Sequence, residues 1–124
     1  MKRLRLFMAM LMVGTILAQI APTQAQGVLL QARGKIILIH MVDVGVRYGP
    51  PSDQIDAEVV VKLDSQPGKA FGFQLRNDAN GLVHQGMLSL LRDALNNGWT
   101  VTIDYNEINR NRMNSMLIRV SASK

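Results

Sequence analysis

The stretch from His84 to Trp99 constrains the fold more than any other, because it is the only convincing amphipathic helix outside the N-terminal segment. At about 3.6 residues per turn, one of its faces is apolar, with His84 near the middle. That face carries Met87, Leu88, Leu90, Leu91, Ala94 and Leu95, and the opposite face carries Gln85, Ser89, Arg92, Asp93 and Asn96. Asn97 and Gly98 are expected to end the helix, because glycine readily adopts the left-handed conformation of a helix terminus. The remaining segments read as strands.

The N-terminus has the three parts of a secretory signal peptide. It starts with three cations, continues as an apolar run over residues 6–20, and ends in small residues up to Ala25. We expect residues 1–25 to be a signal peptide and residues 26–124 to be one domain, in the periplasm or secreted. An uncleaved anchor is the alternative, but a spanning helix needs about 20 apolar residues. No stable membrane anchor is therefore expected after cleavage.

The charge of the chain lies largely in that segment. The 124 residues carry a formal net charge of +5 at pH 7, and three of the 14 basic residues precede the apolar run. The mature chain keeps 11 basic and 9 acidic residues, a difference of +2 that does not indicate a polyanionic partner. The chain has no cysteine, which excludes disulfides, thiolate metal sites and cysteine nucleophiles. So small a domain depends on its core, or on association, for stability.

The segment Lys35–Val46 predicts a long first strand, preceded by a turn at residues 31–34. Its first half is apolar on both faces, with Ile36 and Leu38 on one and Ile37, Ile39 and Met41 on the other. Its second half is expected to point Val42, Val44 and Val46 inward. A strand that is apolar on both faces needs cover on both, from the curl of a barrel or from a neighbouring subunit.

Four further segments alternate with a period of two, which is typical of half-buried strands. In Ile55–Asp64 the inward residues are Ile55, Ala57, Val59, Val61 and Leu63, and the solvent-facing ones are Asp56, Glu58, Lys62 and Asp64. After a turn at residues 65–68, Ala70–Arg76 points Phe71, Phe73 and Leu75 inward. Its Gly72 marks a bulge or a close backbone approach. The last two strands are expected at Trp99–Tyr105 and Ser115–Ala122.

The order of elements is three strands, one helix and two strands, joined by short turns. This order predicts a mainly β fold with one α-helix, the five-stranded Greek-key barrel called the OB-fold, in which the helix covers one end. A long, curved first strand shared by both halves of the sheet fits such a barrel. An open antiparallel sheet with one packed helix is the competing architecture.

The passage MLSLLRDALNNGWTVTIDY, residues 87–105, resembles the binding subunits of pentameric bacterial toxins, most nearly those of the subtilase-cytotoxin type. The likeness covers about the last half of the mature chain. It implies a ring of five OB-folds whose helices line a central pore and whose outer surface binds host glycans. The family usually has a disulfide, which this chain lacks, and none of its sugar-contacting positions is matched residue by residue in this sequence. Small exported bacterial proteins that share the fold without being toxins are the other relatives to consider.

Most kinds of site find little support in the sequence. His40 and His84 lack a third ligand at a suitable spacing, so no metal is expected, and we expect both to be partly buried and hydrogen-bonded. Asp53, Asp56 and Glu58 are interpreted as a solvated acidic face rather than a calcium site. No nucleophile elbow, phosphate loop or dinucleotide fingerprint occurs, so we expect neither an enzyme nor a cofactor. The aromatic residues of the strands point inward, which disfavours nucleic-acid binding.

The polar loop Asn106–Asn114 is the most distinctive stretch left for a ligand. Its candidate residues are Asn109, Arg110, Asn111 and Arg112, whose amides and guanidinium groups suit sugar hydroxyls or a sugar carboxylate. Tyr48, held between Arg47 and two prolines, is a candidate stacking surface for a sugar ring. A solvated turn is the plainer interpretation of the loop. We expect a glycan-binding homo-oligomer, a pentamer if the resemblance holds; the alternative is a periplasmic structural or stress-related OB-fold protein that binds other proteins.

Overall fold

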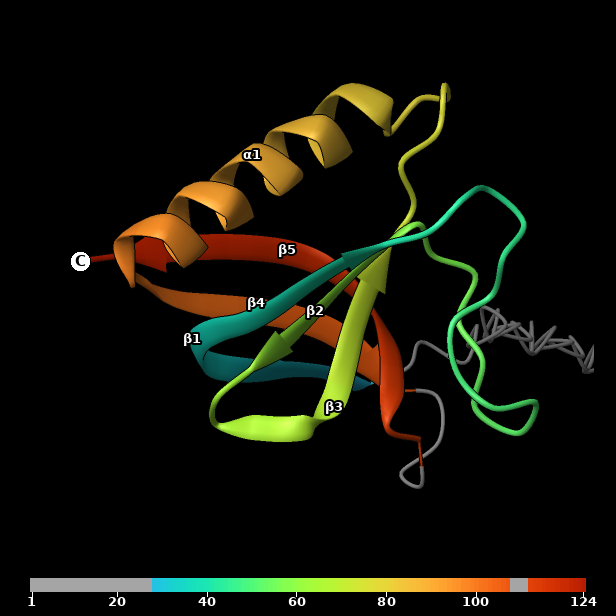
Figure 1. The fold of residues 1–124 in the computed structure, drawn as a ribbon, viewed down its shortest axis with the longest axis horizontal. Coiled ribbons are helices and arrows are strands. Elements are labelled where there is room, and N and C mark those ends of the chain that lie inside the picture. The colour runs from blue at the N-terminus through green and yellow to red at the C-terminus, as the bar shows by residue number, and fades with distance from the viewer. Residues whose placement is uncertain (1–27, 108–111) are drawn as a thin grey trace, which may run out of the picture.

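The computed structural model describes residues 28–107 and 112–124, and the predicted signal peptide lies outside these ranges. Within them, five strands close into a barrel with one helix packed against it (Figure 1). The elements are β1 (Val28–Met41), β2 (Val59–Leu63), β3 (Gln66–Phe73), α1 (Gly81–Asn97), β4 (Thr100–Glu107) and β5 (Asn114–Ser123). Around the barrel the order is β1, β2, β3, β5, β4, and only β3 and β5 run parallel. This is an OB-fold-like barrel, and the predicted fold class is confirmed.

β1 begins earlier and ends earlier than the sequence pattern predicts. Residues 28–35 pair with β4 and residues 36–41 pair with β2, with a register shift between Ile36 and Leu38. The predicted turn at residues 31–34 is wrong. Gly34 lies within the strand, where a Cβ atom would approach the side chains of Asp64 and Ser65 within 2.8 Å. Gly34 does not form a turn. It allows β1 to lie close to the residues that follow β2.

The apolar character of β1 on both faces is observed, but the register shift changes its alternation. Ile36 is buried and Ile39 packs against the core, whereas Ile37 and Leu38 are 51% and 39% exposed. The strand ends at Met41, so Val44 and Val46 lie in the following loop. Both valines are more than half exposed, and their predicted inward orientation is wrong.

The main core fills the barrel and the space below the helix. The predicted inward residues Val59, Val61, Leu63, Phe71 and Phe73 are fully or almost fully buried. From α1, Met87, Leu91 and Ala94 join the same core, so the helix lies across β1, β4 and β5, as Figure 1 shows. Gly98 ends the helix at φ 65°, as predicted. No helix within the described ranges combines the length and apolarity that a membrane span requires.

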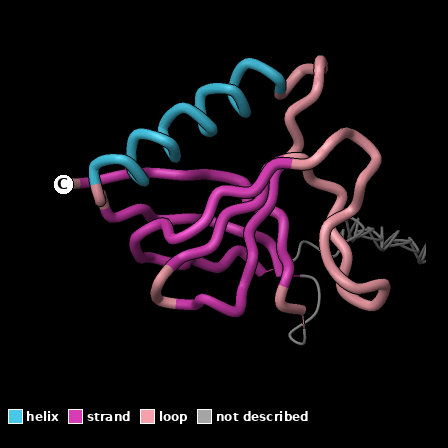
Figure 2. The backbone as a smooth tube through the Cα atoms, in the orientation of Figure 1, coloured by secondary structure: helices cyan, strands magenta, loops and turns pink. Residues whose placement is uncertain are grey.

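A second, smaller core lies outside the barrel. β2 begins only at Val59, and Ile55 and Ala57 pack with Val60 and Ala70 instead of entering the barrel. Because strand residues alternate, Val60 and Ala70 belong to the outer face of β2 and β3. The β1–β2 loop, residues 42–58, therefore folds back over that face. In Figure 2 it is the long pink segment on the side of the barrel away from the C-terminus.

Gly72 makes this second core possible. A Cβ atom at Gly72 would lie 2.5 Å from Cδ1 of Ile55 and 2.7 Å from Cβ of Ala57. Both distances are far below van der Waals contact, so the loop packs directly on the backbone of β3. The close backbone approach that the sequence predicts at this glycine is confirmed.

Candidate functional site

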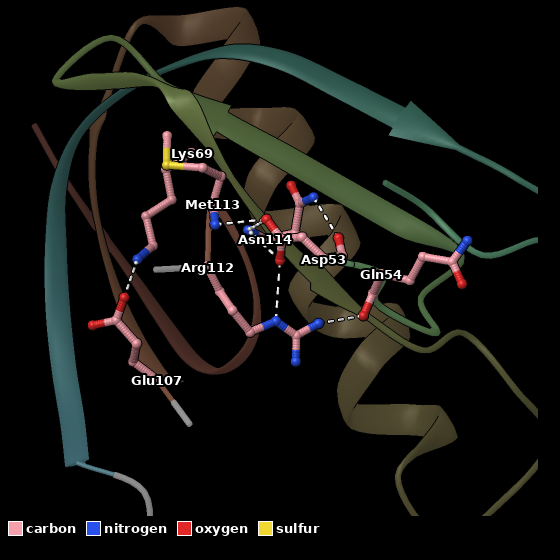
Figure 3. Close-up of polar contacts among 7 residues, drawn as sticks. All are labelled: Asp53, Gln54, Lys69, Glu107, Arg112, Met113 and Asn114. Carbon is pink, nitrogen blue, oxygen red and sulfur yellow. Dashed lines mark hydrogen bonds and ion pairs between the residues drawn. The ribbon is translucent and has the colours of Figure 1, made fainter. Parts of the chain in front are cut away.

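The β1–β2 loop is joined to the start of β5 by the carboxylate of Asp53. This carboxylate accepts hydrogen bonds from the backbone N–H of Met113 at 2.7 Å and of Asn114 at 3.2 Å, and from Nε of Arg112 at 3.0 Å (Figure 3). Asn114 returns a bond from its side-chain amide to the backbone carbonyl of Asp53, at 2.9 Å. The two segments are thereby held in one arrangement, although about 60 residues separate them in the chain.

Burial and hydrogen bonding act in opposite directions on this carboxyl group. Burial raises the pKa of Asp53, but the bonds from Arg112 and from the backbone of Met113 and Asn114 outweigh it and leave the pKa below its ordinary value. Arg112 also donates through Nη2 to the backbone carbonyl of Gln54. The carboxylate is thus ionised and fully engaged at neutral pH.

The loop reaches this position through a left-handed glycine. Gly49 has φ 105°, and a Cβ atom there would lie 2.3 Å from the carbonyl oxygen of Asp53 and 2.5 Å from Nδ2 of Asn114. Only glycine suits both the backbone conformation and the space. Beside it, the backbone of Tyr48 exchanges two hydrogen bonds with that of Ile55, at 2.9 and 3.0 Å. The loop is therefore an ordered part of the fold.

A second ion pair holds the end of β4, on the other side of the β4–β5 loop. Nζ of Lys69 lies 3.1 Å from Oε1 of Glu107 and 4.5 Å from the ring centre of Tyr105. The side chains of this pair are only 10% and 14% exposed. Figure 3 shows the Lys69–Glu107 pair and the Asp53 network as separate groups of contacts. Both flanks of the β4–β5 loop are therefore anchored.

A third ion-pair network joins the end of the β1–β2 loop to the segment after β3. Arg76 contacts Oδ1 of Asp56 and Oε1 of Glu58, each at 2.7 Å, and Glu58 also accepts the backbone N–H of Leu75. The hydrogen bonds that Arg76 donates to Glu58 and Asp56 raise the pKa of Arg76. Glu58 is buried, so the predicted solvated acidic face is wrong. The alternation of inward and solvent-facing residues does not apply to Glu58, because residues 55–58 precede β2 instead of belonging to it.

A pocket of about 320 Å³ opens between these networks. Its lining comes from the β1–β2 loop, the segment after β3, the end of β4 and the start of β5. The residues are Gln54, Ile55, Asp56, Gln74, Asn106, Arg112, Asn114, Ser115 and Met116. Most of the polar groups are carboxamides, and Ile55 and Met116 add apolar surface. Such a pocket presents closely spaced donors and acceptors beside a small apolar patch.

The predicted ligand residues have different outcomes. Arg112 lines the pocket, whereas Asn109, Arg110 and Asn111 lie outside the described residues. Tyr48 is partly buried against the second core, with its ring 5.9 Å from that of His40, and does not line the pocket. Gln54 and Gln74 were not singled out by the sequence, because a carboxamide in a loop or at a strand end is unremarkable until the fold brings several together.

The histidines and acidic residues do not form a metal site in the described part of the chain. His40 is exposed, and His84 packs edge-on against Phe73 with its Nδ1 buried and without a partner among the described residues. The predicted partial burial is therefore wrong for His40 and confirmed for His84, whose Nδ1 lacks the predicted hydrogen bond within the described ranges. Across residues 28–107 and 112–124, no three His, Asp or Glu side chains are grouped so that they could hold a metal ion.

Comparison with known proteins adds no relative. No protein-family model matches the sequence, and neither the curated proteins nor the solved structures include a match to it. Function must therefore be inferred from the geometry of the site, because a fold alone does not determine it.

Proposed function

We propose that this protein is an exported, non-enzymatic binding module that recognises glycans in the pocket between the β1–β2 loop and the start of β5. The observation that carries the proposal is the lining of that pocket. Four carboxamide side chains and one hydroxyl surround a volume of about 320 Å³, next to apolar side chains. Sugars combine hydroxyl groups with apolar ring faces, and a lining of this kind matches both features.

The folded-back loop also supports a compact ligand over a polymer. OB-folds bind oligonucleotides and oligosaccharides on the face of the second and third strands, between the β1–β2 and β4–β5 loops. Here Ile55 and Ala57 cover that face at Val60 and Ala70, so the extended groove is filled by the chain itself. The pocket beside this face, of about 320 Å³, lies near the lower end of the ~300–1,000 Å³ range of small-ligand sites.

Nucleic-acid binding is the less favoured function. Single-stranded nucleic acids need exposed aromatic platforms along a cationic groove. Phe71, Phe73 and Tyr105 are buried in the barrel, and Arg76 and Arg112 are neutralised by carboxylates. These observations favour an uncharged or weakly charged ligand over a phosphate backbone.

Self-association and export complete the proposal. Ile37 and Leu38 form an exposed apolar patch on β1, which suits contact with another copy of the chain. A closed ring, such as the pentamer of the toxin binding subunits, is the form that we propose.

The cationic and apolar N-terminal segment supports export to the periplasm or beyond it.

The test is a glycan array probed with the exported protein, together with two pocket variants. Gln74→Ala and Asn106→Ala each remove a carboxamide from the lining and are expected to lower a saturable, sugar-specific signal. Asn96→Ala, an exposed amide change on the helix, serves as the control and should leave the signal unchanged. A blank array with a co-purifying envelope protein favours the alternative, a periplasmic OB-fold protein that binds other proteins.

A further inference from the structure

We infer that the pocket selects uncharged saccharides and discriminates against acidic ones. This inference rests on the proposed glycan function and concerns the same site. It differs from what the sequence suggests, because arginines in a polar loop are compatible with a sugar carboxylate. The pairing of the charged groups in the pocket leads to the opposite preference.

Arg112 is the cation of the pocket lining, and its guanidinium is already engaged. Nε donates to Oδ1 of Asp53, and Nη2 donates to the backbone carbonyl of Gln54. An arginine recognises a carboxylate best through two parallel N–H groups. With Nε and Nη2 both committed to the loop, the side-on edge of Arg112 is occupied by the protein's own acceptors, and Asp53 neutralises its charge. Its role is to hold the loop that forms the pocket wall.

The charged side chains around the pocket add up to a small negative charge. The lining contains Arg112 and Asp56, which belong to two ion-pair networks. Arg112 pairs with Asp53, and Asp56 shares Arg76 with the buried Glu58. Three carboxylates against two guanidinium groups leave one negative charge among the described residues. Among the residues that the structure describes, an anionic ligand would meet no unneutralised cation at the pocket, and the surplus carboxylate would repel it.

Asp56 carries the surplus charge to the pocket surface. Its side chain is 42% exposed, whereas that of Glu58 is 4% exposed and binds Arg76 through both oxygens. Oδ1 of Asp56 contacts Arg76, and Oδ2 lies 3.5 Å from Nε2 of Gln74, the limit of a hydrogen bond. Oδ2 is thus placed to accept hydroxyl hydrogens, which a neutral sugar supplies and a sugar carboxylate does not.

The test measures dissociation constants for a neutral oligosaccharide that binds on the array and for the same oligosaccharide extended by one sialic acid. The protein is the full chain, recovered after export. The neutral ligand is expected to bind about tenfold more tightly than the acidic one at low salt, and the ratio should shrink as salt screens the repulsion.

Asp56→Asn gives a readout specific to charge. It removes the surplus charge but leaves Arg76 bound by Glu58, so the fold is retained, as circular dichroism can verify. The variant should bind the neutral ligand less tightly and should lose most of the discrimination against the acidic one. Asp93→Asn, the same charge change at an exposed helix position, should leave the ratio unaltered.

The remaining outcomes separate the two proposals. Equal or tighter binding of the acidic ligand, if Gln74→Ala abolishes it, would overturn the preference for uncharged sugars and leave glycan binding in the pocket intact. An unchanged ratio in Asp56→Asn would overturn the role of Asp56 and the charge argument with it. Binding of neither ligand, or of no array glycan, would remove the proposed function itself.

Discussion

Asp53 and Asn114 are hydrogen-bonded to each other in both directions, with the carboxylate accepting the backbone N–H of Asn114 and the carbonyl of Asp53 accepting its side-chain amide. The pair joins the β1–β2 loop to the first residue of β5, and so fixes two walls of the pocket relative to each other. A binding site with walls held in this way loses less conformational entropy when a ligand binds. Asp53 is accordingly the residue on which the shape of the site depends most.

Asp53→Ala should therefore destabilise the protein by about 2 kcal/mol, because it leaves two backbone N–H groups and a guanidinium without their shared acceptor. Urea unfolding followed by tryptophan fluorescence measures the effect. Asp43→Ala, at an exposed aspartate of the same loop, is the matched control and should change the stability little. Equal stability of the two variants would contradict the role assigned to Asp53.

The same carboxyl group predicts how stability depends on pH. Because the pKa of Asp53 is lower in the folded protein than its ordinary value of 3.8, its ionised form stabilises the fold above that value. This contribution is lost as the pH falls through the lower, folded-state pKa. The pKa of Asp104 is lowered as well, by the hydrogen bond from Arg119, so Asp104 titrates with the same sign.

Comparison of the wild type with Asp53→Asn isolates the contribution of Asp53. Between pH 7 and pH 5 the wild type should be the more stable by a constant amount, and the difference should shrink as the pH falls below 3.8 and through the lower, folded-state pKa. Unfolding free energies at each pH measure it. A difference that persisted in acid would mean that the carboxylate's charge is not what stabilises the loop.

Alanine substitutions at Gly72 and at Gly86 should change the stability of the protein in opposite directions. Gly72→Ala would force Cβ into Ile55 and Ala57, and overpacking of this kind costs about 1–3 kcal/mol. In Gly86→Ala, the new Cβ on the helix surface meets no atom within 4 Å, and alanine should stabilise the helix by up to ~1 kcal/mol. Thermal unfolding should therefore show a lower midpoint for the first variant and a higher one for the second. A tolerated alanine at Gly72 would argue against a tightly packed second core.

The barrel was predictable from sequence because its determinants are periodic and local. The spacing of Met87, Leu91 and Ala94 in the helix and the alternation of Val59, Val61 and Leu63 in the strand both predict the burial that is observed. The pocket was less predictable because its parts become neighbours only through long-range contacts. Nothing near Asp53 in sequence indicates that it binds Asn114, and nothing near Glu58 reveals Arg76. The alternation of apolar and polar residues also predicts the wrong face of a strand after a register shift, as it does after Ile36.

Self-association can be tested at two neighbouring residues that the structure distinguishes. Ile37 is 51% exposed on β1, whereas Ile39 packs against the main core. Ile37→Asp should therefore leave a folded monomer and dissociate the proposed ring, since a charge buried in an apolar interface is strongly unfavourable. Ile39→Asp should unfold the chain for the same reason, because Ile39 is partly buried against the main core. Circular dichroism separates these two outcomes before any mass is measured.

The mass itself comes from light scattering after size exclusion at micromolar concentration. The wild type should elute as a single oligomer and Ile37→Asp as a monomer. Val44→Asp, which places the same charge on an exposed valine of the β1–β2 loop, should keep the oligomer intact if the interface runs along β1. Dissociation by Val44→Asp instead of Ile37→Asp would move the interface to the loop. A monomeric wild type would refute the ring. The apolar patch at Ile37 and Leu38 would then not be an interface between copies of this chain.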